Sequence, residues 1–140
     1  MDAFETYLEG LKGLGDWQRP ALPQWSAHVL VFAEMTDGIV WEGLLGWADN
    51  DWAGVNHAVD ALRSMGAAPQ AALVLEALDL AREKGHVGRT GLDRNAVLRD
   101  DAAFGAFSRA EESIESSWEE LWSRAEAYAR ANGWSDFSAA

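Results

Sequence analysis

Cysteine is absent from the 140 residues, proline occurs only three times, and no hydrophobic run approaches the length of a membrane span. Without cysteine, the chain has no disulfide framework, no thiolate zinc site and no cysteine nucleophile. A helix that crosses a bilayer needs about 20 consecutive apolar residues. The N-terminus, Met1-Asp2-Ala3-Phe4-Glu5, is acidic and amphipathic, unlike a secretory signal. We therefore expect a soluble cytoplasmic protein that does not contact membranes.

Basic residues are also scarce, with 11 Lys and Arg against 23 Asp and Glu and a net charge of -12. This charge repels phosphate, so it argues against direct binding of nucleic acid and favours basic partners. The hydrophobic fraction of 49% is ordinary for a folded protein and excludes global disorder. A chain of this length is expected to form one domain over residues 1–140.

The negative charge is unevenly distributed along the chain. Residues 82–99 carry five bases against two acids, a local charge of +3, so the other residues together carry -15. Solubility needs a net charge of only about 2–8 in a small domain. The excess is compatible with a solvated surface and also with a surface that binds a basic partner.

Strand signals are nearly absent, whereas helix signals recur. Asp2 and Glu5 fit a capping box, and Asp51 and the Asp100-Asp101 pair are candidate N-caps. The pattern predicts an all-α single compact domain of six or seven helices. The first expected helices lie between Asp2 and Gly13 and over residues 23–35, 39–48, 52–65 and 69–84. A short helix is expected around Phe104 and Phe107, and a last helix is expected to end at about Asn132.

Three features of this pattern make specific predictions about the fold. Residues 69–84 are apolar nearly all round, so they are expected to form the central and most buried helix. Asp37-Gly38 is expected to end a helix, and residues 85–91 are expected to form a glycine-rich loop. Ile114, Trp118, Leu121, Ala125 and Tyr128 lie at a heptad-like spacing, which predicts one long acidic C-terminal helix.

Catalytic and metal-binding patterns are weak. The Gly85–Gly91 segment has loop glycines beside Arg89 and Thr90, but it lacks the strand-loop-helix context of a phosphate loop. His57 and Asp60 are three residues apart and do not by themselves make a metal site. The acids lie mostly on polar helix faces, where they stay ordinary solvated carboxylates. We expect no enzyme activity, no cofactor and no metal. A metal- or phosphate-handling enzyme is a remote alternative.

The acidic residues of the C-terminal region form a regular row. Glu111, Glu115 and Glu119 are spaced by four residues, which places them on one helix face about 6 Å apart. Eight tryptophans are also unusual in so short a chain; most are expected in the core, with one or two exposed ones anchoring a protein interface. The candidate partner-binding residues are Glu111, Glu112, Glu115, Glu119, Glu120, Asp49, Asp51, Asp100 and Asp101.

Several stretches resemble the bacterial DMP-type DNA-mimic protein family, whose members are small, acidic and all-helical. The residues 61–67, Ala-Leu-Arg-Ser-Met-Gly-Ala, followed by the Ala71–Leu78 helix pattern, are similar to one pair of family segments. Trp118-Glu119-Glu120-Leu121, continuing to Tyr128, is similar to the closing acidic helix. The Val40–Trp47 stretch keeps the hydrophobic rhythm and one glycine but lacks the Asn and Gln of the family motif. The resemblance covers about residues 25–131.

The resemblance implies an all-α fold and, as in a DNA mimic, occupation of the DNA-binding surface of a regulatory or nucleoid protein. Our leading hypothesis is therefore an acidic protein-interaction module that binds a basic protein surface. The alternative is an immunity protein that neutralises a basic toxin such as a nuclease. The oligomeric state is open, and a homodimer is one option.

Overall fold

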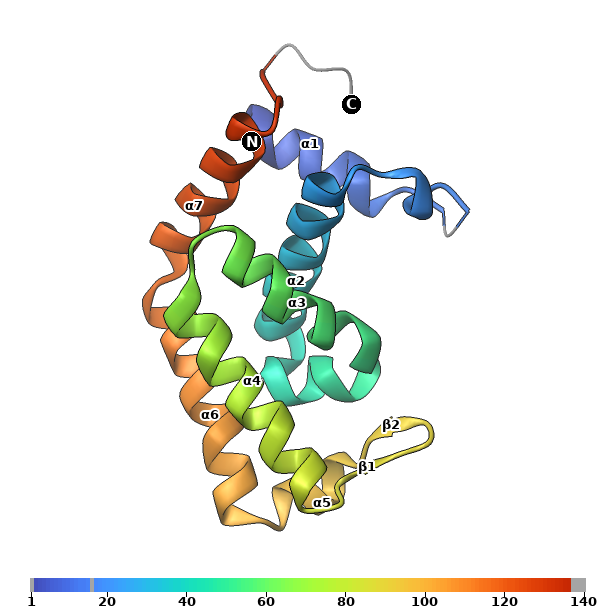
Figure 1. Cartoon of the computed structure of the whole chain (residues 1–140), viewed down its shortest axis with the longest axis vertical. Coiled ribbons are helices and arrows are strands. Elements are labelled where there is room, and N and C mark those ends of the chain that lie inside the picture. The colour runs from blue at the N-terminus through green and yellow to red at the C-terminus, as the bar shows by residue number, and fades with distance from the viewer. Residues whose placement is uncertain (1, 16, 137–140) are drawn as a thin grey trace.

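Helices make up most of the computed structural model, which describes residues 2–15 and 17–136 (Figure 1). The elements within these residues are α1 (Ala3–Lys12), the 3-10 helix η1 (Arg19–Ala21), α2 (Gln24–Asn50), α3 (Trp52–Ser64), α4 (Ala68–Glu83), β1 (Val87–Gly88), β2 (Gly91–Leu92), α5 (Arg94–Leu98), α6 (Asp101–Ser116) and α7 (Trp118–Ala131). The predicted all-α fold is confirmed. Residues 1, 16 and 137–140 of the predicted domain lie outside the described residues. Among the described helices, none has the length and hydropathy that crossing a membrane requires.

Capping chemistry sets several helix boundaries where the sequence predicts them. The Glu5 N–H donates to the Asp2 carboxylate at 2.8 Å, and the Asp2 N–H donates to the Glu5 carboxylate at 3.1 Å, which completes the capping box of α1. Asp51 and Asp100 begin α3 and α6 by accepting backbone N–H groups. Gly66 follows α3 with a φ of +82°, a conformation that glycine adopts without strain.

The second helix differs from the prediction, because α2 passes through Asp37-Gly38 instead of ending there. The buried Trp47 ring lies directly over Gly38: a Cβ on this residue would come within 2.3 Å of Trp47 Cδ1. Gly38 is therefore a packing position. The backbone departs from helical geometry at Gly43 instead, where φ is 75° and ψ is 168°. This kink divides α2 into two segments.

One hydrophobic core joins the helices, and α2 contributes most to it. α2 contacts α1, α3, α6 and α7, whereas α4 packs between α3 and α6 (Figure 1). The helix predicted over residues 69–84 is present as α4, but it is not the most buried helix. It buries the face toward α3 and α6 and exposes Ala72, Glu76 and Asp79 on the other.

Aromatic side chains close the end of the bundle where α1, α2 and α7 meet. Phe4 and Phe32 both contact the Trp122 ring edge-on, with centroid distances of 6.4 and 5.1 Å. Trp134, which follows α7, contacts Phe4 at 5.3 Å. Most tryptophans pack against the core as predicted, whereas Trp17 and Trp41 are 83% and 86% exposed.

The single long C-terminal helix predicted from the heptad-like seam is wrong. α6 ends at Ser116 and α7 begins at Trp118, and the two helices follow one another along one side of the molecule (Figure 1). The Ser116 hydroxyl donates to the Ser113 carbonyl, and the Gln70 amide donates to the Ser117 hydroxyl at 3.2 Å. A side-chain bond to a backbone carbonyl, such as that of Ser116, competes with helix continuation. The short helix predicted around Phe104 and Phe107 is instead part of α6.

The segment predicted as a glycine-rich loop is a small β-hairpin. Val87 pairs with Leu92 and Gly88 with Gly91 in an antiparallel register. Leu92 is buried against the core, which anchors the hairpin, while Arg89 and Thr90 at its tip are exposed. A phosphate loop joins a strand directly to the start of a helix, whereas the tip of this hairpin joins two strands. The segment therefore lacks the geometry of a phosphate loop.

Candidate protein-binding surface

The nine candidate acids fall into three groups on the molecule. Asp49 and Asp51 lie at the junction of α2 and α3, and Asp100 and Asp101 lie at the start of α6. The five glutamates lie on the second half of α6 and the first turn of α7. Because a helix rises about 1.5 Å per residue, Asp101 and Glu115 are about 21 Å apart along α6. The structure therefore brings the glutamates together and leaves the aspartates at separate helix ends.

Glu111 is used inside the fold. Its Oε1 accepts the Leu44 N–H at 2.6 Å, and Leu44 is the first residue after the Gly43 kink. The Glu111 carboxylate thus caps the second segment of α2, where the backbone N–H groups of a helix N-terminus favour negative charge. A Cβ at Gly43 would lie 2.8 Å from the same oxygen, so glycine leaves the space that the carboxylate needs. Glu111 therefore contributes to stability as well as to surface charge.

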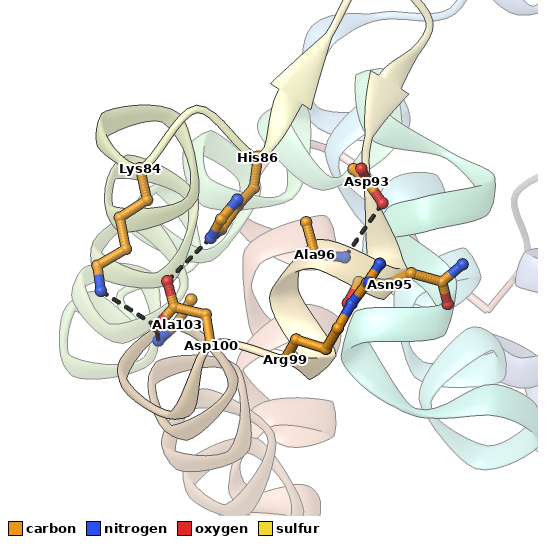
Figure 2. Close-up of polar contacts among 8 residues, drawn as sticks. All are labelled: Lys84, His86, Asp93, Asn95, Ala96, Arg99, Asp100 and Ala103. Atoms are coloured by element: carbon orange, nitrogen blue, oxygen red, sulfur yellow. Dashed lines mark hydrogen bonds and ion pairs between the residues drawn. The ribbon is translucent and has the colours of Figure 1, made fainter.

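The two N-cap aspartates are also engaged internally. Asp51 accepts the Gly54 N–H at 2.8 Å. Asp100 accepts the His86 Nε2 at 2.9 Å, the Lys84 Nζ at 3.1 Å and the Ala103 N–H at 3.2 Å (Figure 2).

These contacts make Asp100 the junction of three elements. Figure 2 shows the carboxylate at the start of α6, with Lys84 reaching it from the end of α4 and His86 from the segment that leads into the hairpin. The bonds from His86, the Ala103 N–H and Lys84 hold the pKa of Asp100 well below its ordinary value of 3.8. Asp100 is therefore an ionised structural residue.

The remaining acids are exposed to solvent. Glu112 and Glu115 lie on α6 and Glu119 on the first turn of α7, and none of these three forms an ion pair with any residue that the structure describes. Glu120 pairs with Arg124 at 2.9 Å. We call Glu112, Glu115 and Glu119 the acidic edge. The helix break at Ser117 means that the regular row predicted on one helix is divided between two.

A functional candidate that the acidic pattern did not reveal lies at the kink of α2. Val40 and Trp41 are exposed there, and Leu98 and Phe104 are partly exposed beside the kink. The sequence offered one signal for this cluster, the high tryptophan content, but not which tryptophan would be exposed. The Gly43 kink beside these residues is predicted by neither helical spacing nor composition.

A groove of about 600 Å³ lies between the first segment of α2 and α3. It contains His28, His57, Asp51 and Asp60, so the predicted His57–Asp60 pair faces it. Burial lowers the pKa of His28 below its ordinary value of 6.5, and its Nδ1 shares a 2.8 Å hydrogen bond with the Tyr128 hydroxyl.

The polar residues that line this groove differ in their exposure to solvent. His57 and Asp60 are exposed, so neither sits in a dry environment that would tune it for acid-base chemistry. Within residues 2–15 and 17–136, no three His, Asp or Glu side chains gather closely enough to hold a metal ion.

Comparison of the chain with protein-family models, with curated proteins and with solved structures finds no match. The resemblance to the DNA-mimic family remains a prediction based on the residues quoted for it. The function must accordingly be inferred from the surface itself.

Proposed function

We propose that this chain is a protein-binding module that engages a basic partner through the acidic edge. The observation that carries the proposal is that Glu112, Glu115 and Glu119 are exposed and lack a cationic partner among the described residues. Elsewhere, many acids are neutralised locally, as Glu34 is by Arg19 and Asp79 by Arg82. Unpaired carboxylates on a helical scaffold attract Lys and Arg side chains of a partner.

The more specific form of the proposal is DNA mimicry, in which the acidic edge occupies the DNA-binding surface of a regulatory or nucleoid protein. Glu112 and Glu115 are about 4.5 Å apart along α6, and Glu119 follows on the first turn of α7. Phosphates follow one another about every 3.4 Å along a DNA strand, a spacing of the same order as that of Glu112 and Glu115 along α6. The acidic edge is thus similar to a DNA strand in the sign and the spacing of its charges. If the proposal is right, duplex DNA competes with this chain for the same surface of the partner.

The experiment compares two charge-reversal variants that alter net charge equally. Glu115→Lys with Glu119→Lys changes the acidic edge, whereas Asp60→Lys with Glu83→Lys changes exposed acids on α3 and α4. Each immobilised protein is incubated with extract of the native cells, and retained proteins are eluted in salt steps. We expect wild type and the Asp60/Glu83 variant to retain the same basic proteins and the Glu115/Glu119 variant to lose them. Equal retention by all three proteins would contradict the proposal.

A second candidate function is inhibition of a basic enzyme such as a toxic nuclease. The exposed Trp41 favours it, because tryptophan is enriched among the residues that dominate protein-protein binding energy. The two functions differ in the readout for the isolated partner. A mimic is displaced by duplex DNA and leaves the partner unable to bind its site, whereas an inhibitor abolishes cleavage by the partner.

A further inference from the structure

Exposed apolar side chains occur on both chain segments that border the Gly43 kink of α2. The exposed large hydrophobic residues of the described chain are Trp17, Val40, Trp41, Leu98 and Phe104. Val40 and Trp41 lie in the first segment of α2 just before Gly43, and Leu98 and Phe104 line the groove at Gly43. Leu98 and Phe104 line a groove of about 220 Å³ together with the buried Leu45 and Phe107. Val40 and Trp41 directly precede Glu42 and Gly43, which line the same groove. We call Val40, Trp41, Leu98 and Phe104 the kink surface.

The exposure of Trp41 contrasts with the other tryptophans of α2. Trp25 packs against Tyr7 and Trp47 is buried, whereas Trp41 is 86% exposed. Large apolar side chains that are clustered in this way on a rigid helix mark an interaction site more often than scattered ones do. Burial of Trp41 against a partner would remove a large apolar area from water.

The charges around the kink surface indicate which kind of partner can bind there. Glu42 and Glu111 line the groove, with Arg94 as the basic residue among its lining. Glu115 lies one helical turn beyond Glu111, so the acidic edge continues from the groove. A second copy of the chain would bring carboxylates against carboxylates, which is unfavourable. An anionic membrane is disfavoured for the same reason.

We propose that the kink surface binds a basic amphipathic helix, whose apolar side chains contact Trp41 and Phe104 while its Lys and Arg side chains face Glu42 and the acidic edge. This inference rests on the proposed function and adds an apolar anchor to it. The acidic edge supplies steering and charge complementarity, and the kink surface supplies desolvated contact area. The partner is therefore selected by apolar pattern as well as by charge.

The test uses two synthetic helical peptides of equal charge, one that alternates Leu and Lys on opposite faces and one in which every Leu is Gln. Trp41→Ala is compared with Trp17→Ala, because Trp17 is equally exposed but lies far along the chain from the kink. Binding is measured by fluorescence anisotropy of the labelled peptide. We expect Trp41→Ala to weaken binding of the Leu/Lys peptide at least tenfold and to leave the Gln/Lys peptide unchanged. Trp17→Ala is expected to change neither.

The Glu115→Lys/Glu119→Lys variant separates the two proposals. If it weakens both peptides while Trp41→Ala behaves like Trp17→Ala, the kink surface is not a binding site and the acidic edge still is. If it weakens the binding of neither peptide while Trp41→Ala weakens binding of the Leu/Lys peptide, the acidic edge is not a binding site and the kink surface is.

Sedimentation of wild type alone is expected to show a monomer. A dimer that Trp41→Ala dissociates would overturn the basic helix as the occupant in favour of a second copy.

Discussion

At the scale of single residues, a carboxylate that the sequence places on a polar helix face can stabilise the fold when it accepts a hydrogen bond from a backbone N–H. Glu111 is the clearest example, because it caps the second segment of α2 at Leu44. Glu115, one turn further along α6, contacts no cation among the described residues and is exposed. The two residues are indistinguishable by spacing and differ only through the Gly43 kink.

Glu111→Ala is therefore expected to destabilise the fold, because it leaves the Leu44 N–H without its acceptor. Loss of a helix cap costs about 0.5–2 kcal/mol, whereas a surface substitution such as Glu115→Ala stays within about 0.5 kcal/mol. Urea unfolding monitored by circular dichroism measures both values. Equal stability of the two variants would mean that the Leu44 contact does not stabilise the fold.

Asp100 makes the stability depend on pH. Its pKa in the folded protein lies below the ordinary 3.8 because of His86, the Ala103 N–H and Lys84. The stabilisation is therefore complete above about pH 4 and is lost as the pH falls toward the folded-state pKa. Asp100→Asn is expected to unfold at lower urea than wild type at pH 7, and the difference should shrink between pH 4 and pH 2. A difference that stays constant over this range would argue against an ionised Asp100 in the fold.

At the scale of elements, helix packing decides what an individual glycine does. Gly38→Ala should stabilise α2 by about 1 kcal/mol if helix propensity alone mattered. Because the added Cβ would lie 2.3 Å from the buried Trp47, we expect a loss of about 1–3 kcal/mol instead. Gly105→Ala on α6 is the control, since its Cβ would meet only the flexible Arg109 at 3.5 Å. Thermal unfolding should show opposite shifts for the two variants.

The elements predicted correctly are those whose signals are local. Asp2, Asp51 and Asp100 cap helices because their side chains reach backbone groups two or three residues away, and Gly66 ends α3 by its own conformation. The continuation of α2 through Gly38 depends on a tertiary contact, which spacing does not reveal. The helix break at Ser117 lies where the Gln70 amide, from a distant segment, donates to the Ser117 hydroxyl, a contact that spacing does not reveal either.

The candidate surface could be predicted only where its signals are local in the sequence. Exposed acids on polar helix faces follow from periodicity, so Glu112, Glu115 and Glu119 could be named in advance. Which acids are engaged by the fold could not be named, because Glu111 and Asp100 meet partners from distant segments. The exposure of Trp41 also has no local signal, because Trp25 and Trp47 of the same helix pack against the core.

At the scale of the whole molecule, the net charge of -12 acts on folding and on binding with opposite salt dependence. Self-repulsion opposes the compact state, and screening relieves it; the Debye length falls to about 10 Å at 0.1 M salt. We therefore expect the melting temperature to rise between 0.01 and about 0.2 M NaCl. Association with a basic partner should weaken over the same range, because its steering is screened.

The two charge-reversal variants separate total charge from its location. Each replaces two acids with lysines and so changes the net charge from -12 to -8. Because self-repulsion depends mainly on total charge, Glu115→Lys/Glu119→Lys and Asp60→Lys/Glu83→Lys should both flatten the rise of melting temperature with salt, and to a similar degree. Binding depends on where the charge lies, so only the former should lose affinity for a basic peptide. Similar loss of binding in both variants would show that net charge, and not the acidic edge, attracts the partner.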